Sequence, residues 1–285
     1  MHTPRHLRWA ALLGAAVALA ACSADPTPTP TPTATSPMPT VTDTPAPTPT
    51  ATDTPAPTPT ATPPGTPVPW PAPPGGAVSV SLAASQDVTL YDSPGSTLAN
   101  GAGEYLFAGL TGQPEARRGF IAFDIAGGVP ADATVFSVEL TLQMTRTGLP
   151  LFDAAVALHR ATAAWGEGAT DATGNEGRGL DVLPGDATWL HRTFDDQLWA
   201  TPGGDFESSA SVTTAVFRLG PYTWGPTEAM VADVQSWLDD PGSNYGWAIV
   251  GDEETHRGVK RFDSRERMDE ATRPVLTVVY VPAAP

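Results

Sequence analysis

Hydrophobic and polar residues alternate along much of the chain beyond residue 77, and this period of two predicts β-strands. The clearest run is 134–147, in which Phe136, Val138, Leu140, Leu142 and Met144 fall on one face and polar residues on the other. Glycine, proline and aspartate separate the runs, as is typical of a β-sandwich. The predicted strands are 78–82, 87–91, 105–110, 118–125, 134–147, 154–161, 188–194, 212–219, 246–251, 258–263 and 274–281.

Two segments depart from simple alternation. Residues 275–281 are apolar on both faces except at Thr277, which predicts a central strand covered on both sides. Thr227 can cap a helix that runs from Glu228 to Asp239, and Asp240-Pro241-Gly242 then ends it. One stripe of this helix is apolar, so we expect it to pack over one end of the sandwich; the stripe contains Met230, Val231, Val234, Trp237 and Leu238.

The first 22 residues predict an export signal. Arg5 and Arg8 precede a short apolar run, too short to span a bilayer with these flanks. The run ends in Leu19-Ala20-Ala21-Cys22, which resembles a bacterial lipobox, and this resemblance implies that Cys22 is lipidated. The alternative is an ordinary signal peptide with a chance cysteine. Cys22 is the only cysteine, so a fold with Cys22 acylated rests on its hydrophobic core without a disulfide.

Residues 23–76 predict a disordered linker rich in threonine and proline. Of the 32 prolines in the chain, 19 lie between residues 26 and 74, beside only two charged residues, Asp43 and Asp53. Such a tract cannot bury a core and favours polyproline II, so it could extend on the order of 150 Å at about 3.1 Å per residue. We therefore expect a stalk that holds one folded domain, residues 77–285, away from a membrane that only the N-terminal lipid contacts.

The charge of the chain limits its partners. Its formal net charge is −16, and the folded domain keeps −15 of it. A domain this acidic is repelled by phosphate backbones, which argues against a nucleic-acid partner. The same acidity disfavours broad electrostatic capture of acidic polysaccharide, and it suits neutral sugars or a divalent cation.

Several segments of the domain resemble one family in order along the chain. Arg118–Ile125 is similar to the family strand R-x-Y-L-K-F-D-L, and Val129–Val135 to its P-x-G-A-T-V linker. Leu158–Gly168 is similar to L-x-R-V-T-x-x-W-x-E-G, and two further short blocks match at 187–189 and 202–206. Phe262–Glu266 and Arg273–Tyr280 then resemble its F-x-S-R-E and R-P-x-L-x-V-x-Y strands.

The family that these segments resemble is the DNRLRE domain. Its members are extracellular β-sandwich modules, some of them grouped as carbohydrate-binding module family 96. The resemblance implies an all-β, jelly-roll-like sandwich with one short helix and a binding function. It also implies that Arg265 and Glu266 form a recurring pair, which we expect on alternate faces of one strand. The chain departs from the family at Ala122, where relatives often carry a basic residue, so the identity of the ligand does not transfer.

No catalytic residues are evident in the sequence. It contains no H-E-x-x-H, G-x-S-x-G or paired-cysteine motif. The domain's three histidines each precede an arginine and are interpreted as surface or sheet-edge residues. Carboxylates are abundant in loops, but spacing alone defines no glycosidase pair. Calcium is the ion that hard oxygen ligands at a sandwich edge would suit, with Asp87, Asp92 and Asp263 as candidates; the alternative is turn-stabilising aspartates.

Five aromatic residues in or beside loops are candidates for stacking on a sugar ring, with core packing as the alternative for each: Trp165, Trp189, Trp199, Tyr222 and Trp224. Arg265 could also bind a ligand, because arginine binds hydroxyls and carboxylates well, although a structural role is preferred. The sequence thus predicts a non-catalytic, lipid-anchored cell-surface module that binds polysaccharide or a cell-envelope glycan. The alternatives are a structural or adhesive surface lipoprotein without a sugar site and, least favoured, a glycan hydrolase or lyase.

Overall fold

The computed structural model describes residues 69–149 and 151–284. The predicted export signal, Cys22 and the linker up to residue 68 lie outside the described residues. Among the described residues, no helix is long and apolar enough to cross a bilayer.

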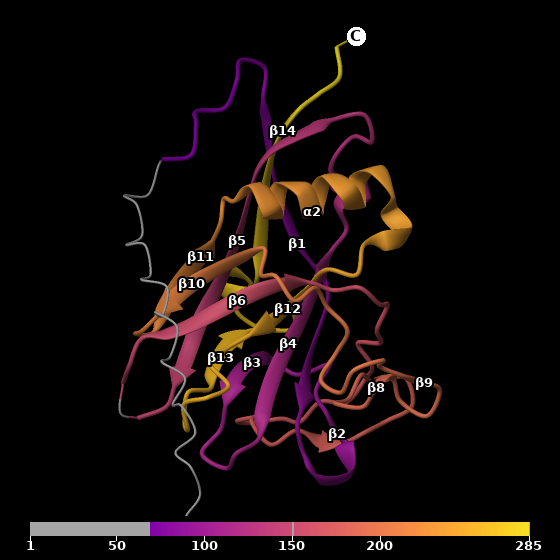
Figure 1. Ribbon diagram of the computed structural model, residues 1–285, viewed down its shortest axis with the longest axis vertical. Helices are drawn as coiled ribbons and strands as arrows, with labels where there is room; N and C mark the ends of the chain where they lie inside the picture. Colours follow the sequence, from indigo (N-terminus) through magenta and orange to yellow (C-terminus); the bar gives the residue numbers. More distant parts are fainter. Residues whose placement is uncertain (1–68, 150, 285) are drawn as a thin grey trace, which may run out of the picture. The chain divides into compact units, whose positions relative to one another are not determined.

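The described residues form an all-β body with antiparallel sheets, as the sequence predicts (Figure 1). Its strands are β1 (Val78–Tyr91), β2 (Leu98–Ala99), β3 (Tyr105–Leu110), β4 (Ala116–Phe123), β5 (Thr134–Thr147), β6 (Ala154–Arg160), β7 (Leu180–Asp181), β8 (His191–Thr193), β9 (Gln197–Leu198), β10 (Val212–Val216), β11 (Gly220–Trp224), β12 (Trp247–Val250), β13 (Lys260–Asp263) and β14 (Val275–Val281). The α-helices are α1 (Ile125–Gly128) and α2 (Glu228–Asp239), and short 3-10 turns lie at Pro94–Ser96, Pro241–Ser243 and Glu270–Thr272.

The strands form two layers that share β1 and β3. One layer runs β1-β14-β5-β13-β3. In this layer β14 and β13 pair with one edge of β5, and β11 pairs with its other edge. The other runs β1-β4-β12-β6-β10, and the end of β3 also pairs with β4. The prediction of separate strands at 78–82 and 87–91 is wrong: they are two halves of β1. An irregularity between Ala84 and Gln86 redirects the chain, so the first half pairs with β14 and the second with β4.

Two hydrophobic cores lie on opposite faces of the layer that contains β4. The larger core joins both layers and contains Ile121, Phe123 and Leu140 together with α2. The smaller core lies on the outer face of β4 and contains Phe120 and Ala122. Residues 161–211, which form a long excursion between β6 and β10, cover this outer face. The alternation along β4 therefore fills two cores instead of one core and a wet surface.

Helix α2 confirms the predicted bounds, the cap and the packing role. The side-chain oxygen of Thr227 accepts a hydrogen bond from the backbone nitrogen of Met230 at 3.1 Å. Met230, Val234, Trp237 and Leu238 are buried, and Figure 1 shows the helix lying across one end of the body. Strand β14 lies between β1 and β5 as expected, but its burial alternates, so it is not covered equally on both faces.

Packing begins before the predicted domain boundary at residue 77. The ring of Trp70 meets that of Phe136 edge-on, with centroids 6.4 Å apart. Phe136 is only partly buried, because a register shift between Val279 and Tyr280 brings Val135 to the core instead. The end of the stretch assigned to the linker therefore contacts the sandwich.

Candidate functional site

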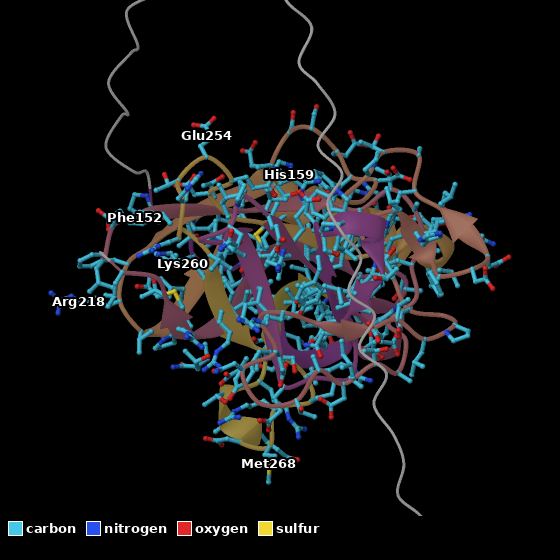
Figure 2. The ribbon with its side chains drawn as sticks, turned by 90° about the horizontal axis from the view of Figure 1, so that it is seen from below. Phe152, His159, Arg218, Glu254, Lys260 and Met268 are labelled. Carbon is cyan, nitrogen blue, oxygen red and sulfur yellow. The ribbon has the colours of Figure 1, made fainter. Side chains whose placement is uncertain are left out.

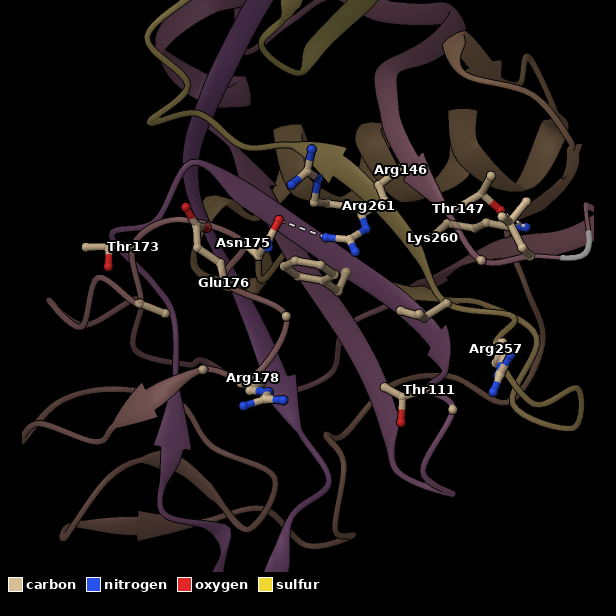
Figure 3. Close-up of a pocket in the computed structure, with 18 residues that line it drawn as sticks. Thr111, Arg146, Thr147, Thr173, Asn175, Glu176, Arg178, Arg257, Lys260 and Arg261 are labelled. Atoms are coloured by element: carbon tan, nitrogen blue, oxygen red, sulfur yellow. Dashed lines mark hydrogen bonds between the residues drawn. The ribbon is translucent and has the colours of Figure 1, made fainter.

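A pocket of about 920 Å³ lies where the ends of β5 and β13 meet two long loops (Figure 3). Arg146 and Thr147 come from β5, and Lys260 and Arg261 from β13. The residues after β3, the loop between β6 and β7, and the loop between β12 and β13 complete its wall. Five of the chain's 15 basic residues line this one pocket: Arg146, Arg178, Arg257, Lys260 and Arg261.

Two of these arginines are direct neighbours across the sheet. Arg261 of β13 is the register partner of Arg146 of β5. Like charges opposite each other destabilise an antiparallel pair. Arg146 donates a hydrogen bond from Nη1 to Oδ1 of Asn175 at 2.8 Å, and Figure 3 draws this bond across the pocket. Folding therefore holds two guanidinium groups together although their charges repel.

The rest of the β13 side of the pocket is rigidly supported. The Arg261 guanidinium lies 3.7 Å from the centroid of the Tyr105 ring, a cation–π contact. Its Nε donates to Oγ1 of Thr145 at 3.2 Å. Lys260 is buried, donates from Nζ to Oγ1 of Thr147 at 2.6 Å, and lies over the Phe152 ring. Burial lowers the pKa of Lys260, and the nearby Asp252 and Asp153 partly oppose that shift.

Arg257 and Arg178 are exposed at the other side of the pocket. Arg257 has a φ of 64°, in the left-handed region that costs a non-glycine residue on the order of 1–3 kcal/mol. Its backbone nitrogen donates to the carbonyl of Thr111 at 3.1 Å, which fixes this conformation beside the end of β3. A strained backbone that nevertheless carries a long cationic side chain points to a use for that side chain.

Glu176 supports the opposite wall. It is the one carboxylate among the described residues that line the pocket. Its oxygens accept hydrogen bonds from Asn100 Nδ2 at 2.9 Å and from the backbone nitrogens of Glu104 and Tyr105 at 3.1 and 3.0 Å. Burial raises the pKa of Glu176, while these hydrogen bonds act in the opposite direction. The carboxylate is thus occupied in holding the loop of residues 172–179 against β3.

None of the five basic side chains has a carboxylate partner in the part of the chain that the structure describes. Among residues 69–149 and 151–284, no carboxylate oxygen lies within 4.0 Å of the charged nitrogens of Arg146, Arg178, Arg257, Lys260 or Arg261. In an acidic protein this is a concentrated positive region, and it is suited to an anionic ligand. The net charge of −16, which disfavours acidic polysaccharide, does not reveal this local excess of positive charge.

A second charged region has the opposite sign. Carboxylate oxygens of Asp87, Glu167 and Glu266 all lie within 4.8 Å of one another and form an acidic cluster that could hold a metal ion. Asp87 comes from β1, Glu167 from the loop after β6, and Glu266 from the turn after β13. Long-range pairing of these segments brings the three carboxylates together.

Arg265 lies against the acidic cluster. Its Nε and Nη2 donate to the two carboxylate oxygens of Glu167 at 2.7 and 3.0 Å, and its backbone nitrogen donates to Oδ2 of Asp87 at 2.8 Å. Its Nε also lies 2.8 Å from Oε1 of Glu266. Arg265 and Glu266 lie in a turn after β13, so the expectation that they occupy alternate faces of one strand is wrong.

Burial favours the protonated form of two carboxyls in this cluster. Burial raises the pKa of Glu266 to about 7, with a further rise from Glu167 and an opposing effect from Arg265. Burial also raises the pKa of Asp87 well above its usual range. The buried Oε2 of Glu266 accepts no hydrogen bond from any described residue. Arg265 alone therefore leaves the cluster with an excess of negative charge, which a proton or a metal ion can offset.

Only one of the three predicted metal ligands belongs to this cluster. Asp87 is part of it, whereas Asp92 and Asp263 are not. The C-terminal strand β14 pairs with the N-terminal strand β1, but Asp263 ends the preceding strand β13, which pairs with β3 and β5. Asp263 is buried, and its Oδ2 lies 3.8 Å from Nε of Arg267.

The predicted sugar-stacking residues lie away from the pocket. Trp224 has no exposed surface, and Trp165 and Trp199 are buried against the outer face of β4, so none of these three presents a ring to a sugar. Trp189 is half-buried, and the guanidinium of Arg118 lies 4.7 Å from its ring centroid. Tyr222 is half-buried, and its hydroxyl binds the backbone of Phe217 and Arg218. None of the five lines the basic pocket.

The three histidines differ in burial. His159 and His191 are half-buried near strand ends, and His256 is exposed. Figure 2 shows His159 and Lys260 as separate labelled positions on the molecule, with Met268 projecting from the turn after β13.

No protein-family model or curated protein matches this chain. The geometry of the two charged regions is therefore the basis for the functional argument.

Proposed function

We propose that this chain is a non-catalytic module that binds anionic glycan in the basic pocket. The observation that supports this proposal is the group of five basic side chains in one pocket, without a carboxylate within 4.0 Å among the described residues. A carboxylated or sulfated sugar would supply the missing counter-charge. Planar guanidinium groups bind such oxygens through paired hydrogen bonds.

The stability of the sheet supports the same proposal. The opposed pair Arg146 and Arg261 works against the pairing of β5 with β13. A sequence keeps such a local conflict where a binding function compensates for it. An anion placed between the two guanidinium groups removes the repulsion, so ligand binding and sheet stability are coupled favourably.

The shape of the pocket favours a sugar over a small inorganic anion. Its volume of about 920 Å³ lies in the upper part of the 300–1,000 Å³ that is usual for organic ligands. Threonine hydroxyls and the Asn175 amide lie among the cations, and these groups can bind sugar hydroxyls. The export signal, lipidated Cys22 and linker expected from the sequence belong to this proposal, because they would hold the pocket outside the cell near an envelope or environmental glycan.

Calorimetry on the full chain, purified in mild detergent, tests the proposal. We expect binding to polygalacturonate but none to the methyl-esterified polymer, which keeps the backbone and masks its carboxylates. Dextran sulfate and plain dextran are compared in the same way. This second comparison shows whether the pocket binds sulfate groups as well as carboxylates. Equal binding of charged and neutral polymers, or binding of none, would contradict the proposal.

A matched pair of variants connects any binding to the pocket. Arg146→Gln removes one pocket charge, whereas Arg218→Gln removes an exposed arginine that lies outside the pocket. We expect the first variant to weaken binding to polygalacturonate about tenfold or more, in line with 1.5–3 kcal/mol for a charge-assisted hydrogen bond. Arg218→Gln should bind polygalacturonate as the unaltered chain does. A loss of similar size in both variants would indicate non-specific attraction.

We further propose that the metal suited to the acidic cluster is calcium. The ligands would be oxygens of Asp87, Glu167 and Glu266, and calcium prefers carboxylate and carbonyl oxygen. A bound ion would stabilise the junction of β1 with the turn after β13. Titration with calcium should raise the melting temperature of the full chain and should leave that of Glu266→Gln unchanged. Equal shifts in both proteins would place the ion elsewhere.

A further inference from the structure

A second cavity of about 760 Å³ adjoins the basic pocket. Five residues line both cavities and form the boundary between them: Thr111, Gly112, Gly177, Arg178 and Arg257. In the view of Figure 3, the Thr111 side chain lies between those of Arg178 and Arg257. The two cavities are therefore consecutive parts of one surface depression and not separate sites.

Backbone contacts fix the boundary between the cavities. A side chain added at Gly112 would begin only 3.3 Å from Cγ of Arg257, so glycine leaves room there for the arginine. The hydrogen bond from the nitrogen of Arg257 to the carbonyl of Thr111 holds the two loops in register. A chain-like ligand could cross this boundary with Arg178 and Arg257 beside it.

The second cavity differs from the first in charge. Its own arginine, Arg117, is buried and engaged: Nη2 pairs with Glu115 at 3.0 Å, Nη1 donates to two backbone carbonyls, and the guanidinium covers the Tyr91 ring. Glu115 also lines this cavity, and Arg117 offsets its charge; the other polar side chains that the described residues place in this cavity alone are neutral, from Ser93, Thr97 and Gln113. The basic pocket and the boundary thus provide positive charge, and the second cavity provides hydroxyl and amide groups.

We propose that the two cavities are successive subsites for one extended anionic polysaccharide, whose charged units bind in the basic pocket and whose continuing chain lies in the neutral cavity. This inference rests on the proposed function. Units in the second cavity bind at high effective concentration once the first cavity is filled. Affinity therefore rises with the length of the ligand until both cavities are occupied.

Size-defined oligogalacturonates, titrated into the full chain by calorimetry, test the length dependence. We expect affinity to rise at least tenfold from the shortest binding oligomer to one that fills both cavities. Thr97→Trp narrows the second cavity alone, because Thr97 is exposed and does not line the first. In this variant short oligomers should bind with unchanged affinity, and the gain with length should vanish.

Thr213→Trp is the matched control, because Thr213 is also exposed and lines neither cavity. Equal melting temperatures of the two variants and the unaltered chain establish that all are folded. A flat length series, or a gain that survives Thr97→Trp, would overturn the two-subsite inference while the proposed function stands. Absence of binding at every length would overturn the proposed function and this inference with it.

Discussion

The acidic cluster and the basic pocket differ in how their charges are satisfied. The carboxylates of the cluster accept hydrogen bonds from Arg265 through both its side chain and its backbone, and Asp87 is almost fully buried. The cations of the pocket contact hydroxyls, an amide and aromatic rings, but no carboxylate within 4.0 Å in the described part of the chain. The first arrangement offsets part of its charge within the fold, whereas the second has no opposite charge within that distance among the described residues.

The difference shows which charge groups in a protein indicate function. Both regions gather like charges, but among the described residues only the cluster has a side chain of opposite charge in contact with it, Arg265. Folding explains the part of the cluster's charge that Arg265 offsets. Folding does not explain why Arg146 and Arg261 lie opposite each other on neighbouring strands. A bound anion is the simplest source of the negative charge that would offset their repulsion.

The largest expected effect comes from removing the compensating charge of the cluster. Arg265→Ala leaves three carboxylates without their guanidinium partner. We expect a loss of about 2–4 kcal/mol in the free energy of unfolding, below the 3–5 kcal/mol of a fully buried pair because Arg265 is partly exposed. Denaturant unfolding measures the change, and Arg218→Ala is the exposed control. A loss as small as that of the control would mean that the cluster does not stabilise the fold.

The next effect separates binding from stability in the pocket. The double variant Arg146→Gln, Arg261→Gln removes the opposed pair, so its affinity for polygalacturonate should fall about a hundredfold, from two lost charge-assisted contacts. Its free energy of unfolding should stay within about 1 kcal/mol of the unaltered value, because relief of repulsion offsets the lost contact with Tyr105. Strong destabilisation would show that the pair is structural, as in the cluster.

A smaller effect tests the strained residue of the pocket. Asparagine tolerates the left-handed backbone of residue 257 and lacks the charge, so Arg257→Asn should lower affinity several-fold. Its melting temperature should stay equal or rise slightly, because the strain of the arginine is relieved. Thermal unfolding and calorimetry of the same preparation check both points. Unchanged affinity would remove Arg257 from the binding surface.

The smallest effect distinguishes the two regions by salt. Exposed charges are screened within about 8 Å at physiological ionic strength, and buried pairs are screened much less. Raising the salt from 50 to 300 mM should weaken polygalacturonate binding several-fold, with little change in the stability difference between Arg265→Ala and the unaltered chain. A binding constant that does not respond to salt would argue against charge as the source of affinity.

The sequence predicted the fold where local rules dominate. Alternation gave β3 and β5 with the observed bounds, and the Thr227 cap gave α2. It missed β11, since Gly220 and Pro221 weaken a strand pattern and the pairing of Tyr222 with Leu142 supplies the strand. It also treated Trp165 and Trp199 as loop residues, because nothing local shows that residues 161–211 fold back over Phe120.

The site was less predictable, because each of its parts comes from segments far apart in the chain. Arg146 and Arg261 become neighbours only through the register of β5 with β13. The net charge of −16 concealed this local excess of positive charge. The sequence does contain a Lys-Arg pair at the start of β13 and an arginine near the end of β5. Only the pairing of the two strands shows that these basic residues share one pocket.

Strand β1 has a mechanical consequence. It is built into both layers, through β14 near Val78 and through β4 near Tyr91. Tension along the chain from residue 69 first meets the contact of Trp70 with Phe136 and then reaches β1, where two sets of backbone hydrogen bonds share it. Pulling this strand free would open the whole sandwich, so the body should resist drag from the side on which the chain enters.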